Sequence, residues 1–148
     1  GGTQIRIAIT LNHTRICNFM AQIINHTPFT GHVSGVSNAS ISLIQKRFAR
    51  SFWGTLGDWL RNQNVRSFKI GITNDPNVRA NKYGNNYQFM DVIYQTSSYE
   101  YSQDMERLLI NAFRDHPGNE NIRGGGAGRK PRSGPFFVYV VYNIGPIR

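Results

Sequence analysis

Hydrophobic residues follow two different spacings along this chain, and each spacing predicts one type of secondary structure. Segments 5–11, 68–73, 88–96 and 136–142 are rich in β-branched and aromatic residues, which is typical of strands. Two other segments carry an apolar residue at every third or fourth position, which predicts helices. These positions are Ile41, Ile44, Phe48, Phe52, Leu56 and Trp59 in the first segment, and Met105, Leu108, Leu109, Ala112 and Phe113 in the second.

Turn-forming residues indicate where these elements begin and end. Residues 27–40 contain proline, glycine and several serines, which predicts a loop, whereas residues 12–26 show no clear pattern. The Asn-Asp-Pro sequence at 74–76 predicts the start of a short helix that stops at Gly84. Ser102 is the expected N-cap of the later helix. After residue 67 the order is strand, helix, strand, helix, glycine-rich loop and strand, which predicts an α/β (α+β) fold.

The composition adds a strong positive charge to this picture. The 148 residues suit one compact domain, and they include 17 Lys and Arg against 8 Asp and Glu, a net charge of +9. Residues 1–57 contain no acidic residue, and a second basic run lies at 123–132. This excess should attract polyanions, so we expect DNA as the partner, with RNA second and no membrane. An anionic membrane surface and a basic domain without a specific partner are the alternatives.

Cysteine and histidine content argues against two kinds of site. Cys17 is the only cysteine, so the chain can form no internal disulfide and no thiolate metal cluster. The 4 histidines lack the spacing of zinc ligands. No apolar run reaches the roughly 18 residues that a membrane-spanning helix needs.

The segment around the predicted helix at Pro76 carries the first candidate chemistry. Arg79 and Tyr83 are four residues apart, so they share one helix face. The preceding strand ends near Gly71, where the lack of a side chain allows close approach of a ligand. Together these groups could bind a phosphodiester. A surface arginine stacked on a surface tyrosine is the alternative interpretation.

Glu106 is the second candidate. It lies about 100° around the helix from Met105, at the border of the apolar stripe. A carboxylate there could lean over the sheet and bind Mg²⁺ or Mn²⁺, which keep several waters and need few protein ligands. An ordinary boundary glutamate paired with a cation is the alternative.

In their order and spacing these residues resemble the GIY-YIG nucleases. Lys69-Ile70-Gly71 stands where that family has Tyr-Ile-Gly on a strand, and Arg79 stands at the place of the arginine on the following helix. Tyr83 lies where family members carry Tyr or His. Glu106 is similar to the metal-binding glutamate, and Asn121 to the asparagine that supports the active site. The resemblance covers roughly residues 58–143.

The resemblance implies a small, mainly antiparallel central sheet flanked by helices, with residues 58–148 as the nuclease-like domain. Residues 1–57 would form a basic strand-plus-helix extension that packs on the core. The implied activity is metal-dependent hydrolysis of phosphodiester bonds in DNA by an endonuclease that uses Mg²⁺ or Mn²⁺. Glu106 would bind the metal, Arg79 would stabilise charge on the phosphate, and Asn121 would fix the local geometry.

The sequence departs from the family pattern in two places. Lys69 replaces the first tyrosine of the Tyr-Ile-Gly signature. No Gly-Ile-Tyr lies upstream, and the candidate stretch at 57–59 is Gly-Asp-Trp, whose Trp cannot act as a base. Either Tyr139 or Tyr142 on the last strand supplies the phenol, or Lys69 acts as the base if burial near Arg79 favours its neutral amine.

Further cations are expected to hold flanking phosphates: Lys46, Arg47, Arg50, Lys82, Arg123, Arg129, Lys130 and Arg132. Two other functions stay open. The domain could bind nucleic acid without cutting it, or it could bind a protein through the amphipathic helix at 41–60.

Overall fold

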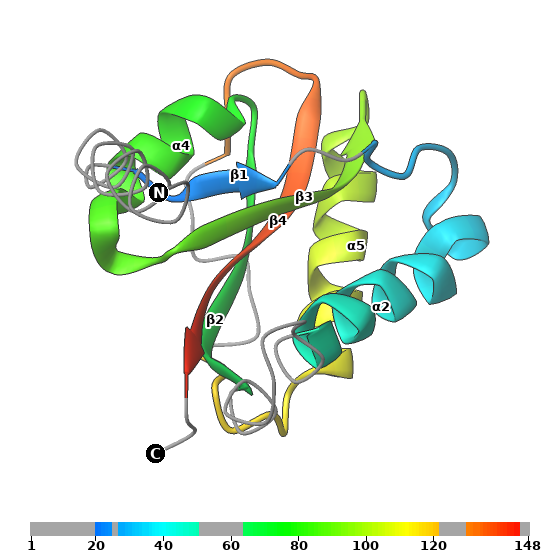
Figure 1. Ribbon diagram of the computed structural model, residues 1–148. Coiled ribbons are helices and arrows are strands. Elements are labelled where there is room, and N and C mark those ends of the chain that lie inside the picture. The colour runs from blue at the N-terminus through cyan, green and yellow to red at the C-terminus, as the bar shows by residue number, and fades with distance from the viewer. Residues whose placement is uncertain (1–19, 25–26, 51–63, 122–129, 146–148) are drawn as a thin grey trace, which may run out of the picture.

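The computed structural model of the protein describes residues 20–24, 27–50, 64–121 and 130–145. A sheet of four strands lies between helices on both faces (Figure 1). The strands are β1 (Gln22–Ile24), β2 (Asn64–Thr73), β3 (Phe89–Thr96) and β4 (Phe136–Gly145), in the spatial order β1-β3-β4-β2. β4 pairs antiparallel with β2 and β3, whereas β1 pairs parallel with β3. The fold is therefore α+β with a mixed sheet.

The strand predicted at 136–142 is confirmed as the central strand β4, and its sequence explains that place. Its residues are apolar on both faces, as a strand covered on both sides requires. Val138, Val140 and Tyr142 enter the core on one face, and Tyr139 and Val141 enter the core on the other. The strands predicted at 68–73 and 88–96 are also confirmed, as the second half of β2 and as β3.

The helices form two layers. α2 (Val33–Arg50) and α5 (Tyr99–Ala112) cover one face, and α4 (Pro76–Tyr83) with the short helix η1 (Gly84–Asn86) covers the other (Figure 1). The predicted start of α4 is confirmed, since the side chain of Asp75 accepts a hydrogen bond from the N–H of Val78 at 3.2 Å and Pro76 follows. Gly84 ends the helix as expected.

The loop predicted at 27–40 is wrong beyond residue 32, because α2 begins at Val33. Val33 is buried and Val36 packs against the same core, so tertiary contacts outweigh the weak helix propensity of the serines and glycine here. Ser40 is satisfied inside the helix, where its Oγ donates to the Val36 carbonyl oxygen at 2.9 Å. The predicted apolar stripe is confirmed as far as Phe48; its later positions lie outside the described residues, as do the strand predicted at 5–11 and the loop at 124–128.

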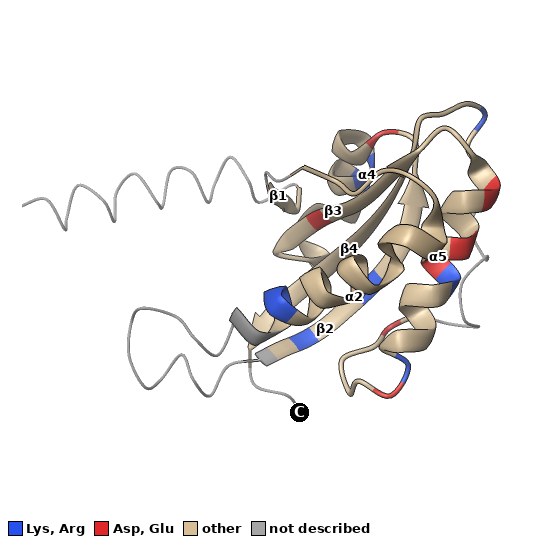
Figure 2. Ribbon diagram, turned by 90° about the vertical axis from the view of Figure 1, so that its right-hand side faces the viewer, with Lys and Arg blue, Asp and Glu red and all other residues tan. Residues whose placement is uncertain are grey.

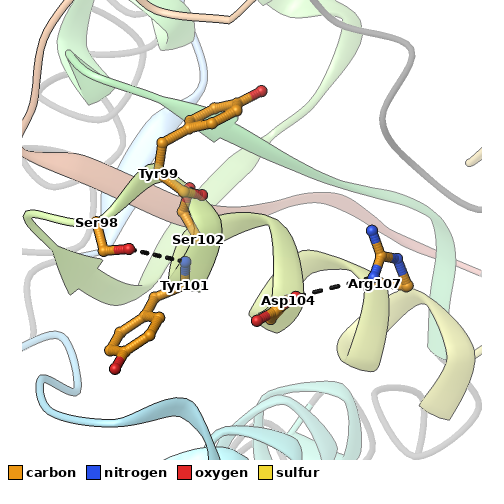
Figure 3. Close-up of polar contacts among 6 residues, drawn as sticks. All are labelled: Ser98, Tyr99, Tyr101, Ser102, Asp104 and Arg107. Carbon is orange, nitrogen blue, oxygen red and sulfur yellow. Dashed lines mark hydrogen bonds and ion pairs between the residues drawn. The ribbon is translucent and has the colours of Figure 1, made fainter.

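The N-cap predicted for α5 is also wrong, by one turn. Ser98 caps this helix, and its Oγ accepts a hydrogen bond from the N–H of Tyr101 at 3.2 Å (Figure 3). Ser102 lies inside the helix, fully buried, and its Oγ donates to the carbonyl oxygen of Tyr99 at 2.6 Å. Both serines precede apolar residues at suitable spacing, so the sequence alone did not separate them.

An ion pair joins α2 to the middle of the sheet. Nε of Arg47 lies 2.8 Å from Oδ2 of Asp91 on β3, an approach that is not aligned as a hydrogen bond. The side chain of Asp91 is 0% exposed and that of Arg47 is 14% exposed. Arg47 was expected to contact phosphates; its guanidinium instead compensates a buried carboxylate. Within the described ranges, every helix is too short or too polar to cross a bilayer.

Replacing Arg47 with methionine should lower the free energy of unfolding by about 3 kcal/mol, because Asp91 stays buried after its guanidinium partner is removed. Denaturant titration followed by circular dichroism measures this change. Lys46→Met is the matched control, since that neighbouring side chain is exposed and its loss should change stability by less than about 0.5 kcal/mol. Equal unfolding midpoints for the two variants would contradict a stabilising role for the pair.

Candidate active site

The candidate site is built on a close approach between β2 and β4. Gly71 on β2 lies directly opposite Tyr139 on β4. A Cβ atom added to Gly71 would lie only 2.7 Å from Cζ of the Tyr139 ring and nearer still to its oxygen. The missing side chain therefore makes room for the phenol at this point of the strand.

The phenol of Tyr139 meets a second phenol from the helix above it. The hydroxyl oxygens of Tyr83 and Tyr139 lie 2.7 Å apart, and either one can donate. Tyr139 is 1% exposed, and burial, followed by the neighbouring Tyr83, raises the pKa of the Tyr139 phenol well above its ordinary value. The Tyr139 phenol is therefore protonated at neutral pH.

Arg79 and Glu106 are both close enough to act on Tyr139 electrostatically. The charge of Arg79 lowers the pKa of the Tyr139 phenol, whereas that of Glu106 raises it, and both effects are smaller than burial. Arg79 is partly exposed on α4, one turn before Tyr83. Tyr83, Arg79 and Glu106, three of the residues predicted for the site, each thus act on the Tyr139 phenol.

Glu106 belongs to the other helical layer, and its charge raises the pKa of the Tyr139 phenol. It lies on α5, which packs on the face of the sheet opposite α4, and it is only 9% exposed. The sequence had placed it at the border of the apolar stripe, and it is more buried than that position suggests. A buried carboxylate beside the site is a suitable hard ligand for Mg²⁺. Within the part of the chain that the structure describes, no three His, Cys, Asp or Glu side chains gather as a metal-binding group.

Asn121 closes the outer edge of β2. Its Oδ1 accepts from the N–H of Ile70 at 2.9 Å, and its Nδ2 donates to the carbonyl oxygen of Ile70 at 2.7 Å. Just before it, the backbone of Gly118 and Glu120 pairs with Phe68 at 2.8 and 2.9 Å. The side chain of Asn121 thus continues the edge pairing up to the residue before Gly71, which fixes the backbone of the site.

A third tyrosine and an acid, neither of them predicted, join this arrangement. The hydroxyl of Tyr87 donates to Oε1 of Glu120 at 2.7 Å. The Tyr87 ring packs edge-on against that of Tyr83, with centroids 5.2 Å apart. Burial and then this hydrogen bond raise the pKa of the Tyr87 phenol. Tyr87 and Glu120 are 33 residues apart in the chain, so no local pattern could have linked them.

Lys69 lies on the α4 side of β2, because it is two residues from Gly71 and side chains alternate along a strand. The parallel bridge between Phe68 and Asn119 places Glu120 beside it. Lys69 is exposed. The burial on which its expected role as the base depends is therefore not found at this position.

Tyr142 does not belong to the site. It lies on the opposite face of β4 from Tyr139, 3% exposed in the core beside α2, where its ring meets those of Phe48 and Phe89. A phenol three residues from Tyr139 on a strand faces the other layer, so only Tyr139 can serve the site.

The cations predicted to hold flanking phosphates are dispersed. Lys46, Lys82, Lys130 and Arg132 are exposed, and Nζ of Lys130 lies 4.9 Å above the ring centroid of Tyr99. The side chain of Arg50, together with Arg123 and Arg129, lies outside the described residues. Comparison of the chain with known proteins finds no matching family model, curated protein or solved structure.

A methyl group at position 71 should displace the phenol of Tyr139. We expect Gly71→Ala to lower the free energy of unfolding by about 1–3 kcal/mol, the usual cost of overpacking. In a Tyr139→Val background Gly71→Ala should lower the free energy of unfolding much less, because the ring that the methyl group would contact is absent. Chemical denaturation of the four proteins measures the coupling; strictly additive effects would contradict the close approach.

His116 holds the turn that leads to the Asn121 segment. Its Nδ1 accepts from the N–H of Gly118 at 2.9 Å, and its ring packs on Phe48 and Phe68 with centroids 5.3 and 5.1 Å apart. Burial lowers the pKa of His116 below its ordinary value of 6.5. The folded state therefore favours the neutral ring.

The stability of the protein should fall as the pH drops below about 6.5, because the unfolded chain then binds a proton at His116 that the folded state resists. The loss grows until the pH passes the lowered pKa of the folded state. Urea unfolding of wild type and of His116→Gln at pH 7.5 and pH 5 tests this expectation. Gln at position 116 keeps a hydrogen-bond acceptor but cannot titrate, so the variant should lose less stability between pH 7.5 and pH 5 than the wild type does. Equal losses of stability would contradict the role of His116.

Proposed function

We propose that this protein is a metal-dependent endonuclease that hydrolyses phosphodiester bonds in DNA. The observation that carries the proposal is the seating of the Tyr139 phenol over Gly71, within hydrogen-bonding distance of Tyr83 and within electrostatic range of Arg79 and Glu106. The resemblance to GIY-YIG nucleases lacked a phenol ahead of Lys69. On β4, Tyr139 carries a phenol directly opposite Gly71, two residues after Lys69 on β2.

The donor set suits a hard divalent cation. Glu106 would hold the ion through its carboxylate, with substrate phosphate oxygens and water as the other ligands, as Mg²⁺ prefers. When bound, such an ion polarises the phosphate and neutralises charge on the leaving oxygen. Its binding should be sensitive to the loss of this one carboxylate, because no group of three or more acidic, histidine or cysteine side chains among the described residues could replace it.

The residues of the chain have distinct roles in the proposed reaction. Water attacks phosphorus while the bond from phosphorus to the leaving oxygen breaks; the water loses a proton to solvent, and the leaving oxygen gains one. Tyr139 and Tyr83 orient the attacking water through their linked hydroxyls. Arg79 stabilises the negative charge that develops on the non-bridging oxygens. Asn121 holds the backbone beneath them at Ile70.

Nucleic-acid binding without cleavage is the second candidate, and one observation favours it. Burial raises the pKa of the Tyr139 phenol, so a phenolate base is not present at neutral pH. Binding to a protein through the helix at 41–60 has less support, because Ile44 and Phe48 on its apolar side are buried in the core of this chain.

Wild-type protein with Mg²⁺ should nick supercoiled plasmid, and Glu106→Gln and Arg79→Ala should each slow nicking by about 100-fold or more. Gel electrophoresis of time courses measures the rates. Glu100→Gln is the matched control: it removes a carboxylate from an exposed position of the same helix and should leave the rate unchanged.

Circular dichroism of each variant separates loss of the site from loss of the fold. Equal nicking by wild type and a folded Glu106→Gln variant would end the catalytic proposal. Binding of DNA without nicking by any form of the protein would favour the second candidate.

A further inference from the structure

A β-bulge near the start of β2 aims an arginine at the face that carries the candidate active site. The pairing of β2 with β4 shifts register between Val65 and Ser67, so Arg66 is the extra residue. Val65 is fully buried in the core on the α2–α5 face. Bulges frequently change the direction of a side chain next to a functional site, so the face of the sheet on which Arg66 lies is informative.

The direction of Arg66 follows from its contact with Gly145. A Cβ atom added to Gly145 would lie 3.7 Å from Cδ and 3.8 Å from Nη1 of Arg66. Tyr139 and Val141 point toward α4, and alternation along β4 directs position 145 to the same side. Arg66 therefore lies on the α4 face of the sheet, and it is exposed.

Three further cations border this face, and together with Arg66 they form what we call the basic strip: Arg66, Lys69, Arg79 and Lys82. Lys69 follows Arg66 along β2 on the same face. Lys82 is exposed three residues after Arg79, on neighbouring positions of α4. Figure 2 shows basic residues on β2 and α4. The strip leads from Arg66 to the end of β2 where Gly71 and Tyr139 meet.

The acidic residues of the described ranges leave the strip positive. Glu100 and Asp104 are exposed on α5, which packs on the opposite face of the sheet; Figure 2 shows acidic residues on this helix. Asp91 is buried against Arg47. Glu120 borders the strip but accepts the hydroxyl of Tyr87. Asp75, exposed at the start of α4, also borders it, so the strip carries four positive charges against two negative ones and keeps a net positive charge.

We propose that the basic strip binds the phosphodiester backbone of one nucleic-acid strand that runs along β2, with Arg66 on a phosphate remote from the reacting one. The inference rests on the proposed function for its Gly71 end and adds the path of the substrate. Arg66 and Lys69 are about 10 Å apart at the rise of a strand. A separation of this size lets the two side chains contact different phosphates of the same strand.

Fluorescence anisotropy of a labelled DNA oligonucleotide, measured in EDTA so that no cleavage occurs, tests the strip. Arg66→Gln should weaken binding. The ratio of its Kd to that of wild type should shrink by about threefold between 50 and 200 mM salt, as expected when one phosphate contact is lost. Arg107→Gln is the matched control: it removes the same charge from an exposed position on α5, where Arg107 lies 3.8 Å from Asp104 (Figure 3).

The controls distinguish failure of this inference from failure of the proposed function. Equal Kd values for Arg66→Gln and Arg107→Gln would overturn the strip, even if wild-type protein nicks plasmid. Weakened binding by Arg66→Gln alone would support the strip, even if no nicking is found. Binding to anionic lipid vesicles that depends on Arg66, with none to the oligonucleotide, would overturn the assignment to nucleic acid.

Discussion

The packing of the Tyr139 ring on Gly71 is the contact that joins the elements of the candidate site. A side chain at position 71 would leave no space for the ring, so the phenol reaches Tyr83 only because this residue is glycine. The same ring is held from below by the sheet and from above by α4. Burial keeps its hydroxyl protonated, which makes it suited to orient a water molecule rather than to take its proton.

The two faces of the sheet differ in content: one holds most of the hydrophobic core, and the other holds most of the residues of the proposed reaction. The α2–α5 face holds the larger core, where aromatic rings surround Phe48 and the Arg47–Asp91 pair ties helix to strand. The α4 face holds the smaller core, the phenols and the basic strip. Glu106 departs from this division, because it belongs to α5 and yet acts on Tyr139 across the layers.

Contacts between distant segments fix the edge strand that carries the site. Asn121 pairs with Ile70, Glu120 with Tyr87, and Asn143 with Ser67, where Nδ2 of Asn143 lies 3.0 Å from Oγ of Ser67. The two bonds of Asn121 satisfy the backbone groups of Ile70 at an edge that would otherwise be open to pairing with another chain. They also hold the backbone on either side of Lys69, so the side chains of β2 project from a fixed frame.

Local chemistry of the sequence determined the central strand, the capped helix at Pro76 and the α+β class, because alternation, proline and capping act within a few residues. It also nominated Arg79, Tyr83 and Glu106, and it left open whether Tyr139 or Tyr142 would supply the phenol. Tertiary structure decided that choice, since only the face of β4 separates the two tyrosines. It likewise turned residues 33–40 into helix, committed Arg47 to a buried carboxylate, and paired Tyr87 with Glu120. Each of these outcomes depends on burial or on partners distant in the chain, which no local pattern encodes.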